Sequence, residues 1–183
     1  MKLMWRNYSF LFIVIFVLES CHSIAQKLQD SRLNEVSGLV VSSKSDEFIW
    51  VHNDSGDDGR IFLINKKGAT QSVYIFTDAV IDCEAISIGT SANGTKEIFV
   101  GDIGDNDAKR PFISIYKFRE PNINIKSDKE ININKVEELK FKYPDGARDA
   151  ECLMIDPIDQ KIYIVSKREN TVGVYSAPLN SKL

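Results

Sequence analysis

The same pattern of short apolar runs occurs three times along the chain, and this repetition constrains the fold more than any other feature of the sequence. Leu39, Ile86 and Leu153 coincide when the three copies are overlaid. The copies begin with "NEVSGLVV" (34–41), "IDCEAISI" (81–88) and "RDAECLMI" (148–155). Such self-similarity indicates one structural unit formed several times, each unit burying its apolar surface against a neighbour.

Each copy consists of short runs that have the composition of β-strands. They are rich in β-branched and aromatic residues, several alternate apolar with polar side chains, and Gly, Asn and Asp separate them. We predict eleven strands, at 38–43, 47–52, 60–65, 72–76, 85–89, 97–101, 112–118, 139–143, 152–156, 161–166 and 172–176. No long amphipathic helix is predicted after Gln26, so we expect an all-β domain.

Four-stranded antiparallel units that repeat are typical of the blades of a β-propeller, which has four to eight of them. The first two copies supply four strands each and the third supplies three, so the sequence predicts a partial β-propeller of about two and three-quarter blades. The predicted units span about 33–78, 79–145 and 146–183. Either the chain is a truncated or split product of a larger propeller, or the units form an open sandwich. Pairing with a second chain is one way to close the ring.

The second unit carries an insertion at 119–135, "REPNINIKSDKEININK". It is polar and rich in Asn and Lys, which favours an exposed loop or a hairpin extension.

The first 25 residues have the composition of an export signal. Lys2 and Arg6 precede an unbroken apolar run at Phe10–Leu18, which is too short to span a bilayer as a helix but fits a signal-peptide core. We expect residues 1–25 to form a helical signal peptide or lipoprotein leader and residues 26–183 to form the incomplete propeller.

Three fates of the leader stay open. "LESC" resembles a lipobox, which would lipidate Cys21; "SIA" resembles an ordinary cleavage site, which would release Gln26; or the leader stays as an uncleaved anchor. In each case we expect an exported protein, which is periplasmic, an outer-membrane lipoprotein or extracellular. Contact with a membrane is expected only through the leader or a lipid.

Charge and cysteine content exclude some classes of partner. The net charge is −3 and no basic stripe is present, so a nucleic-acid partner is not expected. A small anionic ligand or a protein fits better. Beyond the leader the chain has only Cys83 and Cys152, for which two buried free thiols are favoured over one disulfide.

Acidic residues gather at one end of the predicted units. In an up-and-down unit, the loop between its second and third strands lies at the same end as the connection into its inner strand. Asp82 and Glu84 precede or begin the second inner strand, and Asp149 and Glu151 do so in the third unit. The loops at the same end are "HNDSGDDGR" (52–60), "GDIGDNDAKR" (101–110) and "SKREN" (166–170).

Converging carboxylates repel one another unless they are protonated, paired or bound to a metal. Oxygen ligands of this kind suit calcium, although the spacing does not match an EF-hand, and zinc is disfavoured because His52 is the one imidazole beyond the leader. Two interpretations without a ligand stay open. Ordinary turn chemistry accounts for "HNDSGDDGR" alone, and a buried carboxylate that accepts backbone N–H groups accounts for the paired acids.

Other polar residues of the same loops are candidates for ligand binding. These are His52, Asn53, Asp54, Asp57, Arg110, Arg148, Lys167 and Arg168. Acidic and basic groups together suit an anionic substrate bridged by a cation, and they equally suit a solvated surface of paired charges.

The chain resembles an exported bacterial β-propeller family to which no reaction is assigned. The resemblance covers nearly all of 30–178 and rests on "HNDSGDDGRIFLI", "DCEAISIG", "IFVGDIGDN", "YPDGARDAECLMIDP" and "IYIVSKRE". Members of the family are about twice as long, so the chain is expected to match their N-terminal half.

The chain is more distantly similar to six-bladed gluconolactonase-like and calcium-dependent phytase propellers. That likeness implies metal ligands at Asp82, Glu84, Asp102, Asp105, Asp149 and Glu151.

Two functions are consistent with these features. We expect an exported binding or scaffold module with an acidic face that binds calcium. The alternative is a calcium-dependent hydrolase of the phosphoesterase or lactonase type, in which acidic ligands activate water. The sequence contains no G-x-S-x-G nucleophile motif, Walker loop or dinucleotide fingerprint.

Overall fold

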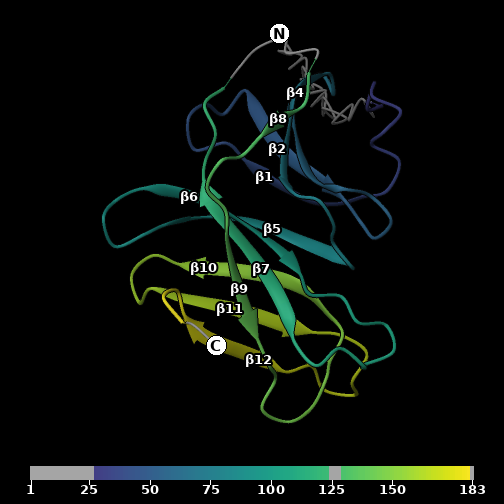
Figure 1. The fold of residues 1–183 in the computed structure, drawn as a ribbon, viewed down its shortest axis with the longest axis vertical. Coiled ribbons are helices and arrows are strands. Elements are labelled where there is room, and N and C mark those ends of the chain that lie inside the picture. Colours follow the sequence, from purple (N-terminus) through teal and green to yellow (C-terminus); the bar gives the residue numbers. More distant parts are fainter. Residues whose placement is uncertain (1–26, 124–128, 182–183) are drawn as a thin grey trace, which may run out of the picture.

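The computed structural model describes residues 27–123 and 129–181, and these residues form twelve strands and no helix (Figure 1). The predicted all-β class is confirmed. The predicted leader and Cys21 lie outside the described residues. No helix among the residues that the structure describes is long and apolar enough to cross a membrane.

The strands form three sheets, and each of the overlaid segments builds one of them. The first sheet has the order β1 (Val36–Val41), β2 (Phe48–Asn53), β3 (Gly59–Asn65), β4 (Thr70–Thr77) and β8 (Ile131–Asn132). The second has the order β5 (Cys83–Thr90), β6 (Lys96–Asp102), β7 (Ile113–Arg119) and β9 (Glu137–Phe141). The third has the order β10 (Ala150–Asp156), β11 (Lys161–Ser166) and β12 (Val174–Pro178).

All eleven predicted strands occur, with ends that differ by only a few residues. β1, β5 and β10 are the inner strands, and β1 and β10 both lie against β5 (Figure 1). The described residues thus form three stacked sheets, which do not close a ring.

Two apolar layers hold the three sheets together. Trp50, Ile61 and other side chains of the first sheet pack on Ile86 and Phe118 of the second. The opposite face of the second sheet, with Phe99, Ile115 and Leu139, packs on Ile155, Ile162 and Ile164 of the third. Burial of this apolar area is the main favourable term in folding. The second sheet is therefore sandwiched between the other two.

Most described residues of the insertion at 119–135 are exposed, as expected for a loop, but two parts of it attach to the first sheet. Its first part buries Glu120, whose carboxylate accepts hydrogen bonds from Ser42 Oγ at 2.7 Å, Ser43 N at 3.1 Å and Trp50 Nε1 at 2.9 Å. Further on, β8 pairs in parallel with β4. The insertion thus ties the second sheet to the first, because its few apolar residues and one buried acid have partners there.

The cysteines also differ from the expected pair of buried thiols. Cys83 is buried between the first two sheets, whereas Cys152 is exposed on the third. Both thiols are free. Cys152 is exposed because its side chain points to the face of the third sheet that carries no further sheet within the described residues.

Candidate metal centre

Each inner strand has an irregularity at the same place. The pairing of β1 with β2 shifts between Val36 and Gly38, that of β5 with β6 between Cys83 and Ala85, and that of β10 with β11 between Ala150 and Cys152. The extra residues are Ser37, Glu84 and Glu151. A β-bulge leaves its extra residue outside the regular ladder and redirects the side chain. The three bulges therefore place one serine and two glutamates at the same end of the inner strands.

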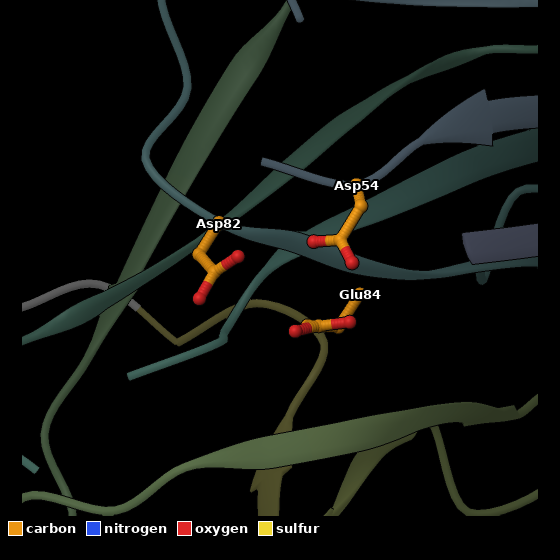
Figure 2. Close-up of side chains that lie close together, drawn as sticks. All are labelled: Asp54, Asp82 and Glu84. Carbon is orange, nitrogen blue, oxygen red and sulfur yellow. The ribbon is translucent and has the colours of Figure 1, made fainter. Parts of the chain in front are cut away.

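The bulged glutamates belong to two groups of carboxylates. Ligand oxygens of Asp54, Asp82 and Glu84 lie within 4.8 Å of one another, and so do those of Glu84, Asp149 and Glu151. Figure 2 shows the first group, whose three carboxylates turn toward a common space. Glu84 is common to both groups, so the five residues, here called the acidic cluster, form one continuous site.

The acidic cluster draws on all three sheets. Asp54 follows β2 of the first sheet, Asp82 and Glu84 lie at the start of β5, and Asp149 and Glu151 lie at the start of β10. Asp82, Glu84 and Asp149 are buried, and the other two are half-buried. The site therefore forms only where the three sheets meet.

Mutual repulsion and burial act on the centre of the cluster. Burial raises the pKa of Glu84 to about 7, and the nearby charges of Asp54 and Glu151 add to this effect against a hydrogen bond from Ser37. Burial also raises the pKa of Asp82 to about 6, together with a hydrogen bond to Asp54 and the charge of that residue. Both shifts mean that charge on these carboxylates is unfavourable without a counterion.

Few hydrogen bonds offset this repulsion. Glu84 accepts one from Ser37 Oγ at 3.1 Å, and Asp82 accepts one from Asn106 Nδ2 at 3.3 Å. Asp149 accepts bonds from the backbone N of Asp105 at 2.9 Å and from Arg168 Nε at 2.5 Å. Glu84 and Asp82 thus keep oxygen lone pairs that are free to bind a cation.

Gly104 makes the position of Asp82 possible. A Cβ atom at this glycine would overlap the carboxylate of Asp82, and the amide of Gly104 donates to the Asp82 carbonyl at 3.1 Å. The backbone of the loop after β6 therefore lies directly against one ligand of the acidic cluster.

The structure places Asp102 and Asp105, which the resemblance implied as ligands, beside the acidic cluster rather than in it. Asp102 accepts hydrogen bonds from the amides of Ile81 at 3.2 Å and Asp82 at 2.9 Å, and from Arg110 Nη1 at 2.8 Å. Asp105 accepts one from the amide of Arg110 at 2.7 Å. These two acids hold the segments that carry the cluster.

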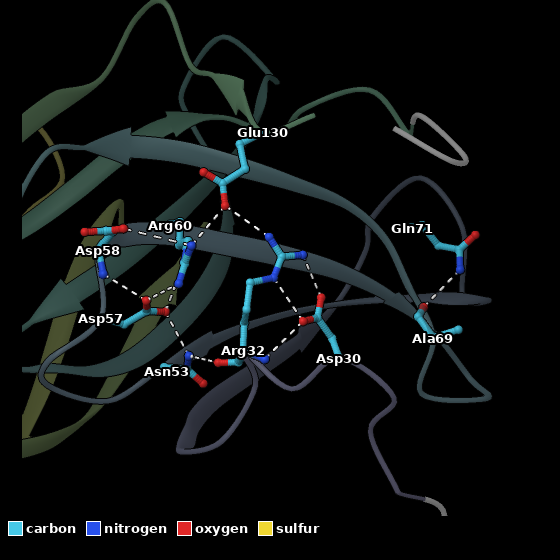
Figure 3. Close-up of polar contacts among 9 residues, drawn as sticks. All are labelled: Asp30, Arg32, Asn53, Asp57, Asp58, Arg60, Ala69, Gln71 and Glu130. Carbon is cyan, nitrogen blue, oxygen red and sulfur yellow. Dashed lines mark hydrogen bonds and ion pairs between the residues drawn. The ribbon is translucent and has the colours of Figure 1, made fainter. Parts of the chain in front are cut away.

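The residues of "HNDSGDDGR" belong to two different sites. Asp54 joins the acidic cluster, although the sequence marked it only as a binding residue. Asn53 and Asp57 turn to a separate polar network with Arg60 (Figure 3), in which Asp57 pairs with Arg60 at 2.5 Å and Asn53 Nδ2 donates to Asp57 at 2.8 Å. The loop is therefore both a turn and a contributor of one ligand.

His52 is buried at the same edge without entering the acidic cluster. Its Nδ1 lies 2.7 Å from the Asn53 carbonyl, and a Cβ atom at Gly38 would overlap its ring. Burial lowers the pKa of His52, which favours the neutral ring. His52 thus packs as a neutral side chain on Gly38 of β1.

Each basic candidate residue has a carboxylate partner. Arg110 contacts Asp102, Lys167 contacts Glu151 and Arg168 contacts Asp149. Arg148 binds Asp145 at 2.8 Å and Glu169 at 3.0 Å, away from the acidic cluster. Arg168 also donates to Asn106. Lys167 and Arg168 therefore border the cluster on the side of the third sheet.

None of the family models, curated proteins and solved structures compared with this chain matches it.

Proposed function

We propose that this chain is an exported binding or scaffold module whose acidic cluster binds calcium, and that it belongs to the propeller family that its motifs resemble. One observation carries the proposal: two groups of three carboxylates share Glu84 and come from three different sheets. A turn or a backbone cap would not require acids from three repeats to meet.

Calcium fits the chemistry of the donors. The acidic cluster offers carboxylate oxygens only, and calcium accepts six to eight oxygen ligands in flexible geometry. Burial is the main cause of the raised pKa values of Asp82 and Glu84, and a bound cation would favour the charged forms of both acids. Calcium sites of extracellular modules have dissociation constants of about 10⁻⁴ to 10⁻³ M, and we expect this range here.

The arrangement of the basic residues favours binding over hydrolysis. A phosphoesterase needs a cationic group free to hold the substrate anion, but Lys167 and Arg168 already contact Glu151 and Asp149. The calcium-dependent phosphoesterase or lactonase remains the alternative. Turnover of p-nitrophenyl phosphate or of a δ-lactone that needs both calcium and Glu84 would replace the binding module by this alternative.

Titration calorimetry of the purified chain tests the proposal. Calcium is expected to bind the wild type in the stated range, and Glu84→Gln is expected to weaken binding at least tenfold because Glu84 serves both groups. Asp107→Asn is the matched control, since Asp107 lies in the adjacent loop and pairs with Lys109 rather than with the acidic cluster. Equal affinity of the wild type and Glu84→Gln would contradict the proposal.

Thermal unfolding gives a second measurement, in which Glu84→Gln is expected to be less stable than the wild type with calcium and no less stable without it. At 10 mM calcium the wild type should gain about 1.4 to 2.7 kcal/mol, which corresponds to a Tm rise of about 3 to 10 °C. Glu84→Gln should lose this gain and yet be at least as stable as the wild type in EDTA, because it removes a repelling charge. A variant that is simply misfolded would be less stable in both conditions.

A further inference from the structure

The pairing register identifies equivalent side chains on the face that each sheet turns toward the following sheet. On the central strands, Trp50 pairs with Val40 in the first sheet and Phe99 pairs with Ser87 in the second. Both aromatic side chains are fully buried. On the next strands Ile61 and Ile115 occupy equivalent positions and are also fully buried.

The third sheet carries the same kind of side chain at these positions, but nothing in the described residues covers them. Tyr163 pairs with Met154 and stands where Trp50 and Phe99 stand in the other sheets. Met154 is 55% exposed. Val174, the equivalent of Ile61 and Ile115, is 67% exposed. We call this surface the third-sheet face.

The first sheet exposes the face that, in the second and third sheets, packs against the preceding sheet. Leu39 and Val41 of β1 are 64% and 50% exposed. The residue equivalent to Leu39 in the second sheet, Ile86, and the residue equivalent to Val41 in the third, Ile155, are both buried against the preceding sheet. We call the surface of Leu39 and Val41 the β1 face.

The two faces are complementary because the chain already joins such faces twice. Residues 27–33 cover part of β2 and β3, where Leu33 packs on Val51 and Phe62, and leave the β1 face exposed. The contacts between inner strands, β1 with β5 and β5 with β10, are the contacts that a further sheet would repeat. Exposed apolar patches of this kind mark association surfaces.

We propose that a second copy of this chain packs its β1 face on the third-sheet face, and that the reciprocal contact closes a two-fold ring. Two sets of three sheets fall within the four to eight blades of closed propellers. The same contact occurs twice, because each copy contributes both faces to the ring. This inference is independent of the proposed calcium site.

Two copies that joined through their third-sheet faces alone would make a different dimer. That arrangement would leave both β1 faces exposed, and it would place like faces against each other where the chain joins unlike faces. Leu39 distinguishes the two arrangements, because it is buried at the contact in the ring and stays exposed in the other dimer.

Light scattering coupled to size exclusion tests the ring with the purified chain. The wild type should have about twice the mass of a single copy, which is 20.7 kDa for all 183 residues, and Leu39→Asp and Met154→Asp should each give monomers. Ile158→Asp is the matched control, because Ile158 is 89% exposed but lies in the turn between β10 and β11, outside both faces. It should leave the dimer intact.

A monomeric wild type at all concentrations overturns the proposal, as does a dimer that persists in Leu39→Asp. Cross-linking provides a second measurement that does not depend on the Asp variants folding. Cys152 is exposed on the third-sheet face, so a bismaleimide should join it to Leu39→Cys of another copy. Cross-linking of Cys152 to Cys152 in the wild type would instead show a dimer joined through two third-sheet faces and would contradict the ring.

Discussion

At the scale of single residues, one extra residue in each inner strand decides which side chains meet. Glu84 and Glu151 reach the acidic cluster because each is the additional residue of a bulge, outside the alternation of its strand. Ser37 occupies the same place in β1 and donates to Glu84 at 3.1 Å. The site therefore depends on backbone geometry as much as on residue type.

Gly104 allows a test of that dependence on the backbone. Gly104→Ala should displace the carboxylate of Asp82 and weaken calcium binding about tenfold, with a loss of about 1 to 3 kcal/mol in the free energy of unfolding. Calorimetry and thermal unfolding measure the two effects. Gly94→Ala is the control: the φ of 82° at Gly94 strains an alanine there, but open space surrounds this position, which lies away from the site. Unchanged calcium affinity in Gly104→Ala would show that Asp82 is not a ligand.

The sequence predicted only part of the acidic cluster. The paired acids Asp82 with Glu84 and Asp149 with Glu151 were found because they recur at equivalent strand starts. The resemblance implied Asp102 as a ligand and left Asp54 as a binding residue, although both follow a second predicted strand in an acid-rich loop. Which of them faces the cluster depends on packing between sheets: Asp102 turns to Arg110, whereas Asp54 turns to Asp82 and Glu84.

At the scale of elements, the strands were predictable and the attachment of the insertion to the first sheet was not. Strand composition and alternation are local, so all eleven predicted strands occur. β8 has two residues and gains its partner from β4, far away in the sequence. From the sequence, Glu120 is indistinguishable from a solvent-exposed charge; in the fold, Ser42, Ser43 and Trp50 donate hydrogen bonds to it. Such contacts depend on the tertiary structure and have no local signature.

Glu120 makes the attachment of the insertion dependent on pH. Burial alone would raise its pKa, but the hydrogen bonds from Ser43, Ser42 and Trp50 outweigh burial and lower it. Because the folded pKa lies below the ordinary value near 4.5, the stabilisation is complete above that value and is lost as the pH falls through the folded pKa.

Glu120→Gln should therefore lower the free energy of unfolding by about 2 kcal/mol at pH 7, with a difference from wild type that shrinks below pH 4. Denaturant unfolding at several pH values measures this difference. Glu47→Gln serves as the control, because Glu47 forms an exposed pair with Lys66 and should change stability little. A loss that did not depend on pH would contradict the role of the ionised carboxylate.

At the scale of the whole molecule, the internal stacking of sheets predicts how stability depends on concentration. If two copies close a ring, unfolding is linked to dissociation and the Tm rises with protein concentration. Calorimetric scans over a hundredfold range of concentration should show this rise for the wild type and Ile158→Asp, and not for Met154→Asp. A wild-type Tm that does not change with concentration would count against association.

The position of the acidic cluster across three sheets has a mechanical consequence. Cations held by the two groups, Asp54 with Asp82 and Glu84, and Glu84 with Asp149 and Glu151, would cross-link sheets that otherwise pack mainly through apolar contacts. Glu84 would act as a bridging ligand, so that a cation bound in one group changes the electrostatic potential, and with it the cation affinity, of the other group. Under mechanical force, the three sheets would then separate cooperatively when calcium is bound and one after another when it is absent.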